Sequence, residues 1–365
     1  MSEFIDCGSD IMIPGIFDTH NHACFGYSPD GKTAEEIRIR TKKYLKGLAA
    51  FGVTSVFPTL FATKPDQESL DSIAVLAEFV GKGQDGASPL GIHFEGPFLN
   101  RTGEHSARYQ PDAIDMSYVQ KCMEAARGTL RLMGHAVELE NSRELTDYLI
   151  KNHCVAAMAH TDADAETAFK AFEYGISVAT HTCNVMTGIH HRDVGALGAA
   201  LLDDRVHCEL ICDGLHVCND MLKLILRAKS HDRIMLISDS SRFVGMPNGV
   251  YHVHDEGKVT VDRDGRVLTE DGALNGSSKG VIFGIRNLVK NVGIALEDAS
   301  MMASKIPCDF YGCGNCKGTL EQGKDADFVL VNDNFDVHET YCMGRRVYSS
   351  ETDTDLANPD LRRES

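Results

Sequence analysis

Three features of the 365-residue sequence predict an α/β fold. Short runs of β-branched and apolar residues alternate along the chain with longer helix-forming stretches, which is the pattern of repeated strand-and-helix units. About eight such runs are present, the number of strands that closes a parallel barrel. Titratable side chains recur where the runs end, as at the carboxyl-terminal face of such a barrel. We therefore predict a (β/α)8 barrel of the TIM type with a small accessory β-domain.

The predicted barrel strands follow one another through the first two thirds of the chain. They cover residues 11–18, 54–60, 89–96, 130–137, 154–161, 177–184, 208–217 and 233–240. The clearest helix-forming stretches cover residues 33–50, 67–80, 142–151 and 165–174. This alternation indicates parallel strands, because two parallel neighbours need a crossover connection that is usually a helix.

The residues outside this alternation predict two further β regions. Residues 245–275 carry short alternating segments with Asp-Gly pairs, which indicate hairpin turns, so we expect a β excursion from the barrel. The stretch from Lys317 to Tyr348 alternates in the same way. We predict a barrel of residues 14–305 and an accessory β-domain of residues 1–13 and 306–365. The acidic and polar tail after about residue 349 is expected to be disordered.

Composition excludes several classes of protein. The chain has 36 basic and 53 acidic residues, a net charge of −17, which disfavours a broad surface for nucleic acid or anionic lipid. No apolar run is long enough to cross a membrane, and the first residues do not resemble a signal peptide. We expect a cytoplasmic protein whose 12 cysteines, scattered through a long chain, are mostly buried thiols. The Cys313–Cys316 pair leaves open a minor metal or redox role.

Five polar residues at the predicted strand ends form a candidate metal site. They are His20, His22, Glu95, His160 and His181. Each has an ordinary structural alternative, such as a core histidine or a helix-capping acid. Imidazole nitrogens with one carboxylate are, however, the ligands of a hydrolytic divalent ion that still accepts a water molecule. We interpret these five residues as metal ligands because residues of this kind end several of the predicted strands.

Asp239 ends the eighth run and is the candidate acid/base. Apolar residues precede it and small polar residues follow it, as in a partly desolvated carboxylate. The alternative is an N-cap aspartate. Beside a metal, such a group can take a proton from bound water and pass it to a leaving group.

Eight separated stretches together resemble one enzyme family. They are PGIFDTHNH, GIHFEGPFLN, AHTDADAE, ATHTCNVM, HHRDVGALGAALLDD, DGLHV, LISDSSRFVGMPNGVY and KGTLEQGKDADFVLV. In this order they resemble the N-acetylglucosamine-6-phosphate deacetylase family of the amidohydrolase superfamily. The match covers nearly the whole chain, and the combination is specific although no single stretch is. Substitutions such as Cys183 and Val194 depart from the family pattern near the sugar site.

The resemblance implies a role for each matching residue. Glu95, His160 and His181 would bind one divalent metal ion, and His20 with His22 would add ligands for a second. Asp239 would be the catalytic acid/base. His105 and His216 would contact the sugar and its acetamide, while Arg192, Asn184 and the Val185 backbone would bind the 6-phosphate. Zinc, iron, manganese and cobalt all suit such ligands.

The implied reaction is deacetylation of N-acetylglucosamine 6-phosphate to glucosamine 6-phosphate and acetate, with Asp239 acting on a metal-bound water. A homodimer is also implied, in which a neighbouring subunit completes the phosphate site. The alternatives are another N-acetylated amino sugar, such as N-acetylgalactosamine 6-phosphate, or another amide, such as a cyclic one. A non-catalytic sugar-phosphate sensor is a further alternative from a different class.

Overall fold

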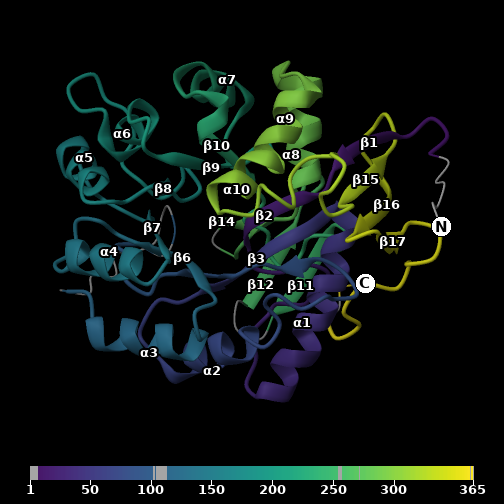
Figure 1. The fold of residues 1–365 in the computed structure, drawn as a ribbon, viewed down its shortest axis with the longest axis horizontal. Coiled ribbons are helices and arrows are strands. Elements are labelled where there is room, and N and C mark those ends of the chain that lie inside the picture. Colours follow the sequence, from purple (N-terminus) through teal and green to yellow (C-terminus); the bar gives the residue numbers. More distant parts are fainter. Residues whose placement is uncertain are drawn as a thin grey trace.

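The computed structural model describes residues 7–101, 103, 113–253, 257–270, 272–361 and 363–364. Eight parallel strands form a nearly closed barrel in the order β10-β9-β8-β7-β6-β5-β3-β2, with the short β4 beside β3 (Figure 1). The strands are β2 (Ile16–Asn21), β3 (Val53–Phe61), β4 (Ser88–Pro89), β5 (Ile92–Glu95), β6 (Leu130–His135), β7 (Val155–Met158), β8 (Val178–Ala179), β9 (His207–Ile211) and β10 (Ile234–Ile237). The predicted α/β barrel is confirmed.

Hydrogen bonds between the first and last barrel strands draw the barrel closed. Ser238, directly after β10, donates from Oγ to the buried carboxylate of Asp18 at 2.6 Å. The next residue, Asp239, donates from its backbone N to the carbonyl of His20 at 3.0 Å. The closing seam therefore brings together two segments that carry candidate site residues.

Helices cover the outside of the barrel (Figure 1). In the described part of the chain they are α1 (Ala34–Leu48), α2 (Gln67–Leu76), α3 (Met116–Ala126), α4 (Ser142–Lys151), α5 (Ala165–Glu173), α6 (Gly195–Leu202), α7 (Asn219–Ala228), α8 (Val281–Asn287), α9 (Leu296–Ala303) and α10 (Lys305–Phe310), with short turns η1 (Ala49–Phe51), η2 (His231–Arg233) and η3 (Leu288–Val292). Helix α1 begins where Thr33 Oγ1 accepts from Glu36 N at 3.2 Å. Helix α2 ends earlier than the predicted residue 80.

Both chain ends contribute to one antiparallel sheet. Strand β1 (Ile11–Pro14) pairs with β15 (Phe328–Val331), which is followed in the sheet by β16 (Val337–Cys342) and β17 (Arg345–Ser349). The accessory β-domain built from both termini is thus present. The division into a barrel of residues 14–305 and an accessory part of residues 1–13 and 306–365 stays a prediction.

The segment between β10 and α8 forms a second antiparallel sheet. Its order is β11-β12-β13-β14, with β11 (Gly249–Val253), β12 (Gly257–Val261), β13 (Arg266–Leu268) and β14 (Leu274–Ser277). The sheet has its own small apolar core, which includes Phe243, Tyr251, Val259 and Val267. We call these four strands the accessory sheet. Because it follows β10 directly, it lies close to the segment that carries Asp239.

The C-terminal tail differs from the disordered ending that the sequence suggests. Asn358 donates from its backbone N to the carbonyl of Phe25 at 2.8 Å, and Glu364 donates to the carbonyl of Val250 at 2.8 Å. Leu361 packs against the core of the accessory sheet. These contacts are largely made by the backbone of the tail, and the polarity of its side chains does not reveal them.

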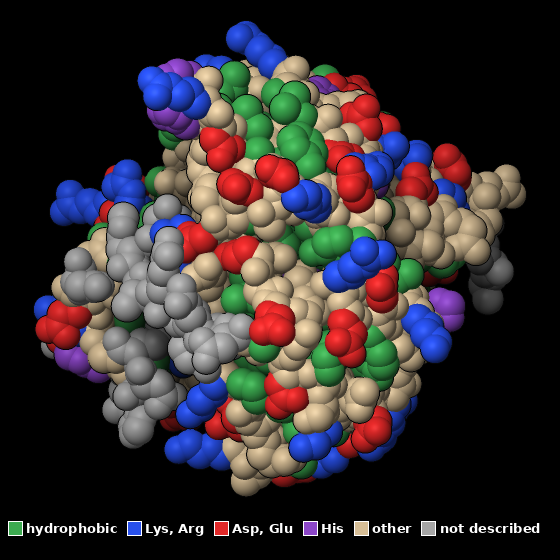
Figure 2. Space-filling model, turned by 90° about the vertical axis from the view of Figure 1, so that its left-hand side faces the viewer, with side chains coloured by type: hydrophobic (Ala, Val, Ile, Leu, Met, Phe, Trp, Pro, Cys, Tyr) green, Lys and Arg blue, Asp and Glu red, His purple; other side chains and the backbone are tan. Residues whose placement is uncertain are grey.

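The surface agrees with the acidic composition. On the face shown in Figure 2, basic and acidic side chains interleave without a broad basic patch. No helix among the described residues is both long and apolar enough to span a membrane. All 12 cysteines are free thiols, so no disulfide joins the elements.

A buried ion pair provides a test of the β-domain built from the termini. Lys317 Nζ lies 2.7 Å from Asp327 Oδ2 and 2.9 Å from Asp325 Oδ2, and Lys317 and Asp327 are both buried. Lys317→Met should lower the free energy of unfolding by about 3–5 kcal/mol, because it leaves a buried charge unpaired. Urea denaturation measures this change. Lys170→Met, which removes an exposed pair with Glu166, should cost at most about 1 kcal/mol. Equal losses in the two variants would contradict the assigned role of the buried pair.

Candidate active site

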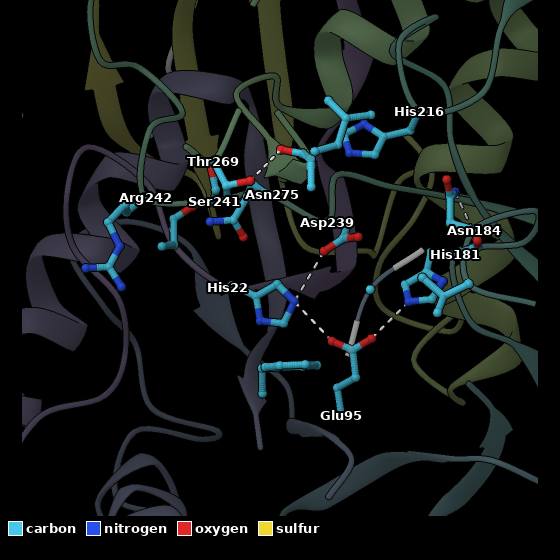
Figure 3. Close-up of a pocket in the computed structure, with 18 of the residues that line it drawn as sticks. His22, Glu95, His181, Asn184, His216, Asp239, Ser241, Arg242, Thr269 and Asn275 are labelled. Carbon is cyan, nitrogen blue, oxygen red and sulfur yellow. Dashed lines mark hydrogen bonds and ion pairs between the residues drawn. The ribbon is translucent and has the colours of Figure 1, made fainter. Parts of the chain in front are cut away.

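Polar side chains converge at the carboxyl-terminal ends of the barrel strands (Figure 3). Strand β2 carries His20, with His22 just beyond its end, and β5 ends at Glu95. His160 follows β7, and His181 follows β8. Parallel strands end on the same side of a barrel, so residues far apart in the sequence meet there. The structure brings together all five candidate metal ligands.

Glu95 lies at the centre of this group, and each of its oxygens faces two imidazoles. Oε1 lies 3.1 Å from His160 Nε2 and 3.0 Å from His181 Nε2. Oε2 lies 3.2 Å from both His20 Nε2 and His22 Nε2. Glu95, His160, His181 and His20 are buried. The result is two three-residue groups that share one carboxylate, and in each group the ligand atoms lie within 4.8 Å of one another.

Neighbouring acceptors set the orientation of two of these histidines. His160 Nδ1 lies 2.6 Å from the carbonyl oxygen of Arg101, and His20 Nδ1 lies 3.5 Å from Glu209 Oε2. A carbonyl or carboxylate oxygen accepts only, so the proton resides on Nδ1 and the Nε2 lone pair points inward. Thr19 holds Glu209 through a 2.7 Å hydrogen bond to its other oxygen. These two imidazoles are therefore prepared to bind a cation.

The electrostatics of the group also fit a cation. Burial disfavours charge on Glu95, yet the imidazoles hold the pKa of its carboxyl well below the usual value. Burial likewise disfavours a charged His20, but Glu95 and Asp239 raise its pKa. Partial burial disfavours charge on His22, but contacts with Asp239 and Glu95 raise its pKa to about 9. The chain thus creates a negative pocket in which a positive charge is favoured, and nitrogen and oxygen donors of this kind suit a divalent transition metal.

Asp239 lies beside the same group. Its Oδ1 is 3.2 Å from His22 Nε2 and 3.6 Å from His20 Nε2 (Figure 3). Burial opposes ionisation of the Asp239 carboxyl, but His20 and His22 lower its pKa. An ionised carboxylate in this position can accept a proton from a nucleophile that approaches the metal ligands.

Three of these residues adopt an uncommon backbone conformation. The φ angles of His160, His181 and Asp239 are +46°, +29° and +47°, in the left-handed region that residues other than glycine rarely occupy. Such conformations persist only where the surrounding structure enforces them, and they cluster at functional sites. Here they turn the chain sharply at the strand ends.

His216 also lines the cavity. Its Nδ1 lies 2.8 Å from Asp213 Oδ2, which also accepts a 3.0 Å hydrogen bond from Ser277 Oγ. Burial disfavours its protonation, but Asp213 raises the pKa of His216 above the ordinary value. With Nδ1 bound to Asp213, Nε2 is the ring nitrogen that remains to donate to a ligand in the cavity.

The candidate phosphate-binding residues are only partly brought to this site. Asn184 and Val185 line the cavity, and Asn184 Nδ2 donates to the carbonyl of His181 at 3.2 Å. Arg192 is exposed and does not line the cavity; its Nε lies 3.0 Å from His191 Nε2. His105 lies outside the described residues.

The cavity has a volume of about 1000 Å³, and the accessory sheet forms part of its wall. Arg242, Thr269 and Asn275 line it, and Figure 3 shows them on the side away from His181. Sequence reasoning predicted the sheet but not its contact with the site. Glu209 was also missed, although a glutamate inside an otherwise apolar strand is a usable signal, because a buried charge requires a partner.

Cys24, Cys183 and Glu138 are close in sequence to site residues or follow a barrel strand, but they do not belong to the ligand group. Cys24 is buried and donates from Sγ to the carbonyl of Tyr44 at 3.4 Å, so it points away from the metal ligands, whereas Cys183 lines the cavity. Glu138, which also follows a barrel strand, accepts from Asp162 N at 2.6 Å. Glu138 therefore supports the loop that follows His160.

Comparisons with known proteins agree with this geometry. The model of the Amidohydrolase family matches residues 11–347. N-acetylglucosamine-6-phosphate deacetylase of Vibrio furnissii is 29% identical over 354 residues, which are 96% of this chain and 86% of that protein. N-acetylgalactosamine-6-phosphate deacetylase of Escherichia coli O157:H7 is 28% identical over 340 residues, with 92% of this chain and 88% of that protein covered.

A solved structure extends the similarity to the fold. It is a variant of N-acetyl-D-glucosamine-6-phosphate deacetylase from Mycobacterium smegmatis, in complex with N-acetyl-D-glucosamine-6-phosphate. That chain superposes with a TM-score of 0.82 at 26% identity, covering 93% of this chain and 87% of its own. The resemblance inferred from the sequence is confirmed: this chain belongs to the amidohydrolase family.

Proposed function

We propose that the protein hydrolyses the N-acetyl group of N-acetylglucosamine 6-phosphate, releasing acetate and glucosamine 6-phosphate. The observation that carries this proposal is the Asp239 carboxylate, 3.2 Å from His22, beside two ligand groups that share Glu95. Relatives named for this reaction cover nearly the whole chain. The site therefore combines a place for a metal with a positioned proton acceptor.

Glu95, His160 and His181 would hold a divalent cation, and His20 with His22 would hold a second. Such a cation supplies Lewis acidity and lowers the pKa of water, to about 7 in favourable cases. Zinc, iron, manganese and cobalt are all compatible with these donors. Glu209 and the Arg101 carbonyl keep two of the imidazoles oriented for this task.

Asp239 acts first as a general base and then as a general acid. Its carboxylate takes a proton from the attacking water, and the resulting acid gives that proton to the amide nitrogen as acetate departs. His216, oriented by Asp213, donates from Nε2 to the substrate carbonyl, where negative charge develops. His105 is proposed as a further sugar contact.

Asn184 Nδ2, the Val185 backbone and Arg192 are proposed to bind the 6-phosphate. An arginine suits this role because its guanidinium donates two parallel hydrogen bonds to phosphate oxygens. Arg192 is exposed and lies away from the cavity of its own subunit. This position supports the proposal that the protein is a homodimer in which a neighbouring subunit completes the phosphate site. We also propose a cytoplasmic location.

The galacto epimer is the alternative with specific support, because a deacetylase named for it is 28% identical to this chain. A cyclic amide hydrolase with a carboxylated lysine on its fourth strand fits less well, since β6, the fourth barrel strand, contains no lysine. A sugar-phosphate sensor fits less well still, since it has no use for a carboxylate aimed at a metal site.

Asp239→Asn should reduce turnover by about 10²- to 10⁴-fold, because both proton transfers lose their carrier. Acetate release from the metal-loaded protein measures turnover, and elemental analysis checks that the metal is retained. Asp220→Asn, at an exposed position on α7, is the matched control and should keep full activity. Turnover near that of the unchanged protein in Asp239→Asn would refute the assigned role.

A panel of N-acetylated sugars tests the substrate. We expect the highest kcat/KM for N-acetylglucosamine 6-phosphate, with a loss of roughly 100-fold or more for the sugar without phosphate, because charge-assisted hydrogen bonds disappear. Arg192→Ala should reduce the difference in kcat/KM between the phosphorylated and the unphosphorylated sugar. Arg227→Ala, on the exposed face of α7, should leave that difference unchanged. Equal kcat/KM values with and without the phosphate would contradict the proposal, and a preference for the galacto epimer would favour the alternative.

A further inference from the structure

The C-terminal tail links the turn that follows His22 to the accessory sheet. We call residues 358–361 with Arg363 and Glu364 the C-terminal strap. In Figure 1 the C-terminal end of the chain lies near β11. At its start, Asn358 donates from its backbone N to the carbonyl of Phe25 at 2.8 Å and from Nδ2 to the carbonyl of Gly26 at 3.0 Å. The strap thus holds the turn that follows His22.

The other end of the strap holds the accessory sheet. Glu364 N donates to the carbonyl of Val250 at 2.8 Å, and Arg363 Nη1 donates to the carbonyl of Asn248 at 3.0 Å. Arg363 also pairs with Tyr251 of β11 as an antiparallel bridge. Between the two ends, Leu361 packs against the apolar core of the accessory sheet. Backbone pairing and apolar burial together distinguish this contact from a tail that merely rests on the surface.

The approach of the strap is close enough to restrict the sequence of the turn. A Cβ atom at Gly26 would lie 2.6 Å from Asn358 Cβ and 3.2 Å from Leu361 Cδ2. The φ angle of Gly26 is also +80°, a conformation that side chains disfavour. The turn and the strap therefore fit together as packed surfaces.

The turn is bonded in its own right to the segment after Asp239. Phe25 N donates to the carbonyl of Val244, and Gly26 N donates to the carbonyl of Arg242, both at 2.7 Å. Arg242 lines the cavity. On the opposite side, the β13–β14 part of the accessory sheet supplies further lining residues, among them Thr269 and Asn275. The strap touches both supports of this wall without lining the cavity itself.

We propose that the C-terminal strap is a positioning element that fixes the accessory sheet against the barrel mouth, and so sets the shape of the sugar-binding wall. The strap contacts neither the metal ligands nor Asp239 in the described residues. Its loss should therefore weaken substrate binding more than it slows the chemical step. This inference rests on the proposed deacetylase function for its kinetic consequence but not for its structural one.

The test compares point variants of the full chain. Leu361→Ala removes the apolar anchor and should raise KM for N-acetylglucosamine 6-phosphate by roughly tenfold while kcat changes by less than about twofold. Leu361→Met should restore KM, because methionine fills a similar volume. Thr354→Ala, at an exposed tail position, is the matched control. An unchanged KM in Leu361→Ala, or a loss confined to kcat, would overturn the proposal.

Hydrogen–deuterium exchange provides a readout that needs no activity. In Leu361→Ala, and in a chain that ends at Asp355, the amides of β11, β12, β13 and β14 should exchange faster while those of β5 and β6 keep their protection. Unchanged exchange in the accessory sheet would overturn the proposal even if the enzyme is active. Inactivity of the unchanged protein together with faster exchange in the variant would instead count against the deacetylase function alone.

Discussion

The site depends on one buried carboxylate, Glu95, placed between four imidazoles. A buried anion is costly in a protein interior unless positive charge or hydrogen-bond donors surround it. Here the two oxygens of Glu95 divide the histidines into two pairs, and Asp239 adds a second carboxylate next to one pair. This arrangement of carboxylates and imidazoles suits the binding of a cation better than a purely structural role. The left-handed backbone at His160 and His181 is the structural cost of aiming their side chains at the same point.

Other parts of the structure hold these side chains in position. Glu209 and the Arg101 carbonyl orient the imidazoles, and the bond from Asp239 N to the carbonyl of His20 closes the barrel beside them. The accessory sheet then walls the cavity on the side that the barrel leaves open. The orientation of the side chains at the strand ends and the shape of the cavity therefore depend on elements that are distant in sequence.

Much of this arrangement could be predicted from the sequence. Alternating apolar runs identified the barrel, and polar residues at run ends identified His20, Glu95, His160, His181 and Asp239, because strand ends of one barrel face must meet. Contacts between elements could not be read in this way. The support from Glu209, the lining by the accessory sheet and the ordered tail all depend on tertiary packing, which local periodicity does not encode. The exposed position of Arg192 also has no local signature, because an arginine that lines a cavity and one on the surface look alike in the sequence.

Anomalous X-ray scattering from crystals of the metal-loaded protein tests the central claim most directly. The account predicts a peak at the metal absorption edge within bonding distance of Glu95, His160 and His181. A second peak, if present, should lie between Glu95, His20 and His22. Metal bound elsewhere, for example at Cys313 and Cys316, with no peak in contact with Glu95, would contradict the account.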